Sequence, residues 1–415
     1  MARRTTQIGS VNVLERSLVA VSIVLVIVGM IAVGSASGPQ SVANGSSIWS
    51  FMMRDVLYVL VGLGGFMLAC RMPTRTLARL ATPAIVVSLG LLGVVELMGT
   101  STMGGQRWLS FSSFSFQPSE LFKLTSCLYL AVVIARVERT SRHWVDILKW
   151  SAPVALGAGL IFLEPDMGTA SVVLLVSFGM LILAGLPRTS IRFLSLLGLG
   201  ALGVFAIGAP YRRQRLLSFL HPGADPNGAG YQVLQAKIGL GAGKWTGLGF
   251  GNSREKWGLL PNAHTDFIFA IIGEEFGLIG SVLVLGLFFW LITLGIQTAR
   301  RAPDRESQLL ASGITLWLAL ETIINVASVV GWWPVTGIPL PFLSYGGTSL
   351  IINLLALGLL VNVARRATTA PRPASATAAA ARAPLRPRYA PATSTAQRRG
   401  ASAHTPLVRE RRRKS

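Results

Sequence analysis

Long blocks of apolar residues, separated by short polar segments, constrain this chain more than any other feature. A helix that crosses the hydrocarbon core of a bilayer needs about 20 mostly apolar residues, with about 17–25 as the usual range. The blocks lie near residues 17–36, 55–70, 78–98, 120–135, 149–164, 169–186, 191–209, 265–298, 308–331 and 347–364. They predict an all-α polytopic membrane protein with about ten transmembrane helices.

The composition agrees with this fold class. Only 13% of the 415 residues are charged and 51% are hydrophobic, whereas a soluble domain carries about 25% charged residues. These values exclude a cytoplasmic enzyme, a disordered chain and a disulfide scaffold. Cys70 and Cys127 both lie in apolar blocks, so they form neither a disulfide framework nor a zinc motif.

The basic residues orient the chain, because short cytoplasmic loops are enriched in Lys and Arg. With the N-terminus in the cytoplasm, the inside segments before the tail hold 15 Lys and Arg residues. The first three outside loops hold only Arg54 and Arg107. We therefore expect both termini in the cytoplasm. The one large extracytoplasmic loop, 210–264, is an exception because it carries seven basic residues.

These segments define the expected domain organisation. Residues 1–16 form a cytoplasmic N-terminal segment, residues 17–366 the membrane domain, and residues 367–415 a disordered basic cytoplasmic tail. From residue 365 onward the chain holds 13 Lys and Arg residues and one acid. Such a tail either lies near anionic membrane lipid or docks a cytoplasmic partner. It has almost no aromatic residues to stack on bases, so we expect no nucleic-acid partner.

Acidic residues in apolar blocks need an explanation, because each costs at least about 2.5–3.5 kcal/mol on insertion scales. The acids in or beside apolar blocks are Glu96, Glu120, Glu164, Asp166, Asp266, Glu274, Glu275 and Glu321. Most of them share the outer half of the membrane although they come from different spans. This pattern predicts one polar site that opens to the outside.

Two segments that contain these acids mark expected helix boundaries. Gln117-Pro118-Ser119-Glu120 begins a helix, and Lys123 lies on the same face as Glu120. Lys123 therefore pairs either with Glu120 or with an acid from another span. Glu164-Pro165-Asp166 is a sharp break between two blocks, where Asp166 either caps the next helix or belongs to the site.

Residues 261–267 lead into the long eighth block. Asp266 either caps that helix or acts in the site together with His264. Glu274 and Glu275 lie about 12–13 Å further along a continuous helix. At that depth one of the two glutamates should pair with a cation, for which Lys123 is a candidate.

Three segments expected at the outer face of the membrane contribute basic residues or interrupt a helix. Residues 239–251 are rich in glycine and include Lys244, but they lack the Walker A pattern. They form a cationic surface suited to an anionic headgroup such as a pyrophosphate. Arg107 beside Trp108 either anchors the chain at the interface or binds a phosphate. Proline and glycine between residues 334 and 348 predict a broken or re-entrant stretch that lines a cavity.

Together these motifs resemble the SEDS family over roughly residues 15–366. They occur in the order of that family. The motifs are Gly105-Gln106-Arg107-Trp108-Leu109, Gln117-Pro118-Ser119-Glu120 with Lys123, Glu164-Pro165-Asp166-Met167-Gly168-Thr169, His264-Thr265-Asp266-Phe267-Ile268-Phe269-Ala270 with Gly273-Glu274-Glu275, and Pro341-Phe342-Leu343-Ser344-Tyr345-Gly346-Gly347-Thr348. Within the family the chain is most similar to the division-associated branch, and the elongation-associated branch shares nearly every motif.

The resemblance implies a peptidoglycan glycosyltransferase that polymerises lipid II at the outer face of the bacterial plasma membrane, with undecaprenyl pyrophosphate as leaving group. It implies Asp266 as the general base, supported by a charge network of Lys123, Glu120, Glu164, Asp166, Glu274 and Glu275. The implied substrate-binding residues are Arg107, Gln117, Ser119, His264, Thr265, Lys244, Ser344 and Tyr345. No cofactor is certain, and a divalent cation, Mg²⁺ or Mn²⁺, held by Glu164 and Asp166 stays open.

The implied partners are lipid II, the lipid-linked glycan strand, membrane lipid, a class B penicillin-binding protein that crosslinks, and other division proteins at the septum. A lipid II flippase is the main alternative. A flippase path needs polar residues through the inner half of the membrane, whereas this chain concentrates them outside. A pure scaffold would leave the buried acids unexplained.

Overall fold

A computed structural model describes residues 2–43, 45, 47, 49–102, 105–111, 114–140, 144–207, 219 and 230–369. All of these belong to one compact unit, Met1–Ala370. The predicted basic tail after residue 369 and most of residues 208–229 in the large outer loop lie outside the described residues.

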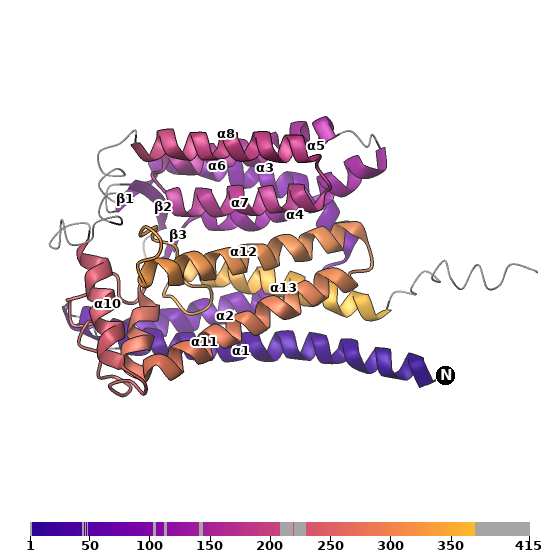
Figure 1. The fold of residues 1–415 in the computed structure, drawn as a ribbon. Helices are drawn as coiled ribbons and strands as arrows, with labels where there is room; N and C mark the ends of the chain where they lie inside the picture. Colours follow the sequence, from indigo (N-terminus) through magenta and orange to yellow (C-terminus); the bar gives the residue numbers. More distant parts are fainter. Residues whose placement is uncertain are drawn as a thin grey trace, which may run out of the picture. The chain divides into compact units, whose positions relative to one another are not determined.

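Most of the described chain is helical. The long helices are α1 (Ala2–Ala43), α2 (Ser50–Arg71), α3 (Thr74–Met98), α4 (Pro118–Thr140), α6 (Ala152–Leu163), α7 (Met167–Leu183), α8 (Arg188–Ile207), α11 (Ile268–Arg301), α12 (Arg305–Val329) and α13 (Gly347–Thr369). They lie side by side, and successive ones run in opposite directions (Figure 1). Two shorter helices, α5 (Trp144–Trp150) and α10 (Tyr231–Gly243), lie at opposite ends of this bundle.

Six of these helices are long and apolar enough to cross a membrane: α1 over Val13–Val42, α2, α3, α11, α12 and α13 over Gly347–Ala367. Helices α6 and α7 are apolar but shorter. Large apolar side chains remain exposed on the outer helices α2, α3 and α11, whereas α12 and α13 are mostly buried. The chain is therefore a multi-pass membrane protein, as the apolar blocks predict.

The blocks place some boundaries wrongly. The apparently short second and fourth blocks belong to helices of 22 and 23 residues. Residues 149–164, expected to form one span, are divided between α5 and α6 around Ser151. A proline near the start of α6 favours a new helix start there.

A small antiparallel sheet departs from the all-α expectation. Its strands β1 (Thr100–Thr102), β2 (Gly105–Phe111) and β3 (Phe114–Phe116) lie between α3 and α4, in the order β1-β2-β3. Trp108 pairs with Thr100, and Leu109 pairs with Phe116. Apolar residues alternate with serine over residues 109–111 and 114–116, which suits half-buried strands.

Helix α11 is broken at Gly277, where φ is 68° and ψ is −163°. The backbone groups freed by the break bond to the segment after α10. The amides of Leu278 and Ile279 donate to the carbonyls of Lys244 and Trp245 at 2.9 and 3.1 Å. A Cβ atom on Gly277 would lie 2.4 Å from the Gly247 amide nitrogen, so both the positive φ and the close approach require glycine.

The segment between α12 and α13, residues 330–346, contains no helix. Its prolines and glycines explain this, because proline lacks an amide donor and glycine favours turns. The expected break in this stretch is therefore confirmed. Together with residues 244–267, β1–β3 and α10, the segment lies at the end of the bundle opposite α5 (Figure 1).

Candidate functional site

Asp266 lies in the turn that precedes α11. The N-cap residue of that helix is Phe267, so Asp266 occupies the position before the cap. The Asp266 carboxylate accepts a hydrogen bond from the Thr265 hydroxyl at 2.9 Å. Its backbone carbonyl accepts one from the Asn325 side-chain amide at 2.8 Å.

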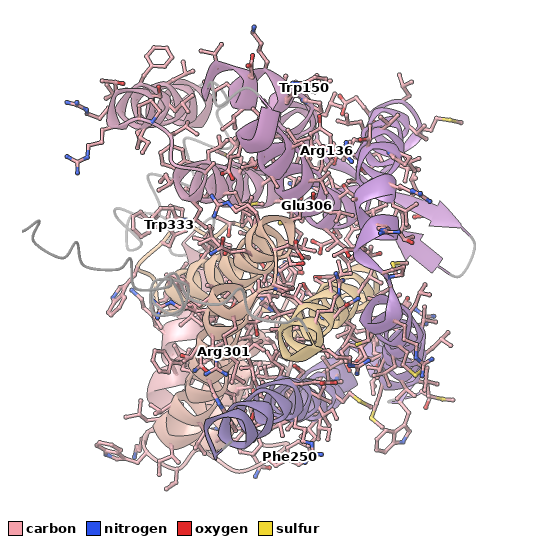
Figure 2. The ribbon with its side chains drawn as sticks, turned by 90° about the vertical axis from the view of Figure 1, so that its right-hand side faces the viewer. Arg136, Trp150, Phe250, Arg301, Glu306 and Trp333 are labelled. Carbon is pink, nitrogen blue, oxygen red and sulfur yellow. The ribbon has the colours of Figure 1, made fainter. Side chains whose placement is uncertain are left out.

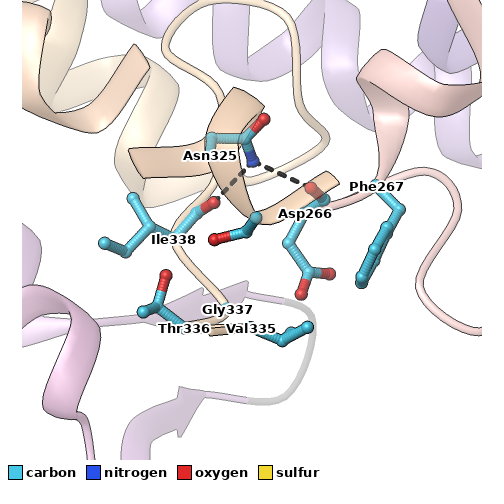
Figure 3. A pocket seen from close by; sticks show the side chains of 8 residues that line it. Asp266, Phe267, Asn325, Val335, Thr336, Gly337 and Ile338 are labelled. Carbon is cyan, nitrogen blue, oxygen red and sulfur yellow. Dashed lines mark hydrogen bonds between the residues drawn. The ribbon is translucent and has the colours of Figure 1, made fainter. Parts of the chain in front are cut away.

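The side chain of Asp266 points toward the segment after α12 (Figure 3). The pocket there is lined by Asp266, Phe267, Asn325, Ser328, Val335, Thr336, Gly337 and Ile338. The Asn325 amide also donates to the Ile338 carbonyl at 2.8 Å, and Ser328 donates to the Pro334 carbonyl at 3.0 Å. Helix α12 thus holds the Asp266 turn and the non-helical segment on either side of one pocket.

A buried charge cluster joins α4 to α12 close to this pocket. The Lys123 ammonium pairs with Glu120 at 2.8 Å and with Glu321 of α12, and all three side chains are at most 2% exposed. Glu321 and Asn325 are four residues apart, so they share one face of α12. The cluster therefore lies about 6 Å along the helix from the residue that holds Asp266.

One of the two glutamates, Glu275, pairs with a cation as expected, but that cation is Lys256 and not the candidate Lys123. Glu274 accepts hydrogen bonds from the Ser253 hydroxyl and from the Arg254 amide, the latter at 2.9 Å. Glu275 pairs with Lys256 at 2.9 Å and accepts a bond from Ser35 of α1 at 2.6 Å. The two glutamates instead attach the 244–260 segment to α11 and α1.

The Gln117 and Asp166 motifs meet, although 49 residues separate them. The Gln117 amide donates to the Asp166 carboxylate at 3.2 Å and to the Ser119 hydroxyl at 3.0 Å. The other Asp166 oxygen accepts from the Thr169 amide at 3.1 Å, which confirms Asp166 as the cap of α7. A Cβ atom on Gly168 would lie 2.7 Å from the Thr336 carbonyl. The Asp166 turn therefore packs against a segment that lines the pocket.

Arg107, on strand β2, binds the backbone of the Asp166 turn. Its guanidinium donates to the backbone carbonyls of Glu164 and Pro165 at 3.1 and 2.5 Å. The Glu164 side chain is 1% exposed, and neither carboxyl oxygen has a hydrogen-bond partner among the described residues. Burial, followed by the charges of Asp166 and Glu96, raises the pKa of Glu164 to about 8, and Arg107 opposes this shift. Glu164 therefore holds a proton at neutral pH.

His264, Ser344 and Tyr345 form the other side of the Asp266 turn. The Tyr345 amide donates to the His264 carbonyl at 2.9 Å. Their rings lie 5.7 Å apart, and both contact the ring of Phe51 from α2. Burial lowers the pKa of His264, so its ring is neutral at pH 7. Ser344 accepts a bond from the Leu340 amide at 2.8 Å and stabilises its own turn.

Lys244, expected to bind the substrate, is not among the residues that line the pocket. It is exposed at the end of α10, and its carbonyl accepts the Leu278 amide beyond the break in α11. The helical stretch 268–276 separates that break from Asp266 by about 13 Å.

In the described part of the chain, no three His, Cys, Asp or Glu side chains are arranged to hold a metal ion. Both Asp166 oxygens are already hydrogen-bonded. A divalent cation held by Glu164 and Asp166 stays a prediction.

Sequence reasoning missed several residues that build the site. Asn325, Ser328 and Lys256 were not singled out, and Glu321 was noted only as a buried acid. Asn325 lies four residues after Glu321 in an apolar block. This spacing places two polar residues on one face of an apolar helix, a pattern from which Asn325 could have been identified.

The model of the FtsW, RodA and SpoVE family, which is described as "Cell cycle protein", matches residues 15–369 of this chain. The chain belongs to this family. It is 36% identical to a probable peptidoglycan glycosyltransferase FtsW of Aeromonas salmonicida, covering 84% of this chain and 90% of that protein. It is 38% identical to the protein of the same name from Coxiella burnetii, covering 84% and 95%.

Two solved structures share the fold. One is a chain of a peptidoglycan synthase complex described for its coordination of polymerization and crosslinking. It has a TM-score of 0.69 at 30% identity and covers 84% of this chain and 97% of that chain. The other is the rod shape determining protein RodA of Thermus thermophilus, with a TM-score of 0.64 at 30% identity, covering 84% and 95%.

Proposed function

We propose that this chain is a peptidoglycan glycosyltransferase that polymerises lipid II during cell division. The observation that carries the proposal is the Asp266 carboxylate, which faces a pocket built by α12 and the segment after it. The names of the FtsW relatives support the activity and the division role. Because the RodA structure has the same fold, elongation remains the alternative role.

The proposed glycosyl transfer requires one general base. The 4-hydroxyl of the incoming sugar attacks the anomeric carbon of the growing lipid-linked strand, and a new C–O bond forms. The bond to undecaprenyl pyrophosphate breaks, and the pyrophosphate leaves with the electron pair. Asp266 takes the hydroxyl proton as the new bond develops, a role that contributes about 10²–10⁴-fold. The pyrophosphate needs no proton to leave, so one carboxylate suffices.

The neighbouring residues support this base. Asn325 fixes the backbone of Asp266, and Thr265 donates to its carboxylate. The cluster of Lys123, Glu120 and Glu321 joins α4 to α12 and keeps Asn325 in place. In this proposal these three residues position the base and do not touch the substrate.

The proposed substrate contacts lie on both sides of Asp266. On one side are Gln117, Ser119 and the Asp166 turn, and on the other are His264 and Tyr345. Arg107 places a positive charge beside the Asp166 turn, where it stabilises the charge that develops on the leaving pyrophosphate. Glu164, protonated at neutral pH, adds no negative charge there.

We further propose ten membrane crossings, by the long helices α1–α4, α6–α8 and α11–α13. Both termini would lie in the cytoplasm, with the pocket at the outer face. Residues 1–16, 17–366 and 367–415 would act as N-terminal segment, membrane domain and basic tail. The similarity to a chain of a polymerization and crosslinking complex supports a class B penicillin-binding protein as partner at the septum.

The test compares purified wild-type chain with Asp266→Asn, incubated with lipid II and the transpeptidase partner. Asp146→Asn, on the short helix α5, removes one carboxylate charge far from the pocket and is the matched control. We expect glycan strands from wild type and Asp146→Asn and none from Asp266→Asn, with equal partner binding by all three. Equal glycan product from Asp266→Asn would reject the proposal, and lipid II translocation without polymer would favour a flippase.

A further inference from the structure

The segment between α10 and the Asp266 turn arranges its side chains in an unusual way. Its acid, Glu255, is 3% exposed, and Lys256 is 8% exposed. By contrast Trp245, Phe250 and Trp257 are 70%, 59% and 67% exposed. A loop in water buries its aromatic residues and exposes its charges. This segment instead exposes its aromatic residues and buries Glu255 and Lys256.

The arrangement is fixed and not a fluctuation of a loose loop. The carboxylates of Glu274 and Glu275 bind Ser253, the Arg254 amide and Lys256. These buried bonds anchor the middle of the segment to α11 and hold the three aromatic side chains outward.

Helix α10 presents a similar outer face. Leu234 and Ile238 lie four residues apart on one side and are 39% and 50% exposed. The opposite side, with Val233, Ala236 and Gly239, is buried, and α10 contacts α11. The helix therefore turns an apolar stripe away from the protein.

This apolar surface continues the outer face of a membrane-spanning helix. The backbone bonds from Leu278 and Ile279 to Lys244 and Trp245 place the two surfaces side by side. Leu278, Ile279 and the following Val282 and Leu283 are about half exposed or more on α11, which is long and apolar enough to cross the membrane. Phe250 lies at the edge of the bundle in Figure 2.

The exposed charges on this surface have one sign. Over residues 230–259 the exposed charged side chains are Lys237, Lys244 and Arg254, and the single acid is buried. Cations beside exposed tryptophans are typical of the membrane interface, where aromatic rings lie at headgroup level and basic groups meet phosphates.

We infer that residues 231–259, which we term the interfacial segment, lie in the headgroup region of the outer leaflet and bind phospholipid. Trp245, Phe250 and Trp257 insert toward the acyl chains, as in an amphipathic interfacial helix. Arg254 and Lys244 contact lipid phosphates. Leu260, the residue after the interfacial segment, donates its amide to the Glu255 carbonyl at 2.8 Å. Leu260 lies six residues before Asp266, so the membrane contact of the segment sets the height of that turn.

Spin labels on single cysteines test this inference in the full-length protein. The labels replace Phe250 and Trp257, and the native Cys70 and Cys127 are buried and stay unlabelled. Leu283→Cys serves as the lipid-facing reference, and the exposed Gln106→Cys on β2 as the water-facing reference. The vesicles contain phosphatidylcholine alone or mixed with phosphatidylglycerol, without any partner protein.

We expect the labels at 250 and 257 to collide with oxygen and to exclude a water-soluble nickel chelate, as at 283. Access of the chelate equal to that at 106 would overturn the inference. If the chelate is excluded only after a transpeptidase partner is added, the surface docks protein and the inference also fails. Circular dichroism of each labelled variant checks that the fold is retained.

Arg254→Gln gives an independent readout of the charge contact. Its backbone amide still binds Glu274, so the segment keeps its anchor. At about 1 kcal/mol per basic residue near an anionic surface, we expect chelate access at residue 257 to rise ~fivefold in vesicles with phosphatidylglycerol. Little change is expected in neutral vesicles. An equal change in both lipid mixtures would contradict a phosphate contact.

Discussion

Replacing Lys123 by methionine is the most informative test of the buried charge cluster. Methionine keeps the length and apolar stem of the side chain but removes the ammonium. Glu120 and Glu321, each 1% exposed, would then face each other without a cation. Breaking a buried ion pair by removing one partner costs about 3–5 kcal/mol, because the charge left behind stays desolvated. We therefore expect the free energy of unfolding of Lys123→Met to fall by about that amount.

The control removes the uncompensated charges as well. In the triple variant Lys123→Met, Glu120→Gln and Glu321→Gln, no charge remains in this cluster, and replacing a complete ion cluster is often close to neutral. The triple variant should therefore regain most of the lost stability. The assay is reversible unfolding in mixed micelles, followed by circular dichroism. A loss below about 1 kcal/mol in the single variant, or a triple variant no more stable than the single one, would refute the reasoning.

Three further variants test other parts of the account. Gly277→Ala forces a Cβ atom to within 2.4 Å of backbone at positive φ, so it should lower the unfolding temperature and the polymerisation rate. Gly286→Ala, on the same helix with open space around it, should change neither. Asn325→Ala removes two bonds that hold the pocket and should cost about 1–3 kcal/mol in unfolding experiments, with a lower kcat; unchanged kcat and stability would count against its role. Because burial raises the pKa of Glu164 from 4.5 to about 8, the unfolded state loses this proton first. Stability is therefore highest below pH 4.5 for this group and falls as pH rises to about 8. Glu164→Gln should flatten this dependence, and an unaltered pH profile of unfolding would contradict the assignment.

Local patterns were enough to predict the membrane class and several motifs of the site. The length of an apolar run reflects the thickness of the bilayer, so helices such as α12 could be located without a structure. Asp166 as a cap and the break after α12 also follow from short-range rules on caps, proline and glycine. Each of these depends on residues that are close in sequence.

Long-range pairing could not be predicted in the same way. The need of Lys123 for a carboxylate was evident, but its partner Glu321 lies 198 residues away. Depth along the helix makes Lys123 a candidate partner for Glu274 or Glu275, but the cation beside Glu275 is Lys256, from the segment after α10. The break at Gly277 depends on carbonyl groups of Lys244 and Trp245, and glycine is common in membrane helices without a break.

Chemical rescue of Asp266→Ala tests most directly whether this carboxylate is the base. The measurement is the initial rate of glycan polymerisation from lipid II, as formate is added to the variant and to wild type. The account predicts a rate about 10²–10⁴-fold below wild type without formate, rising with formate in the variant alone. A variant that polymerises at the wild-type rate without formate would contradict it.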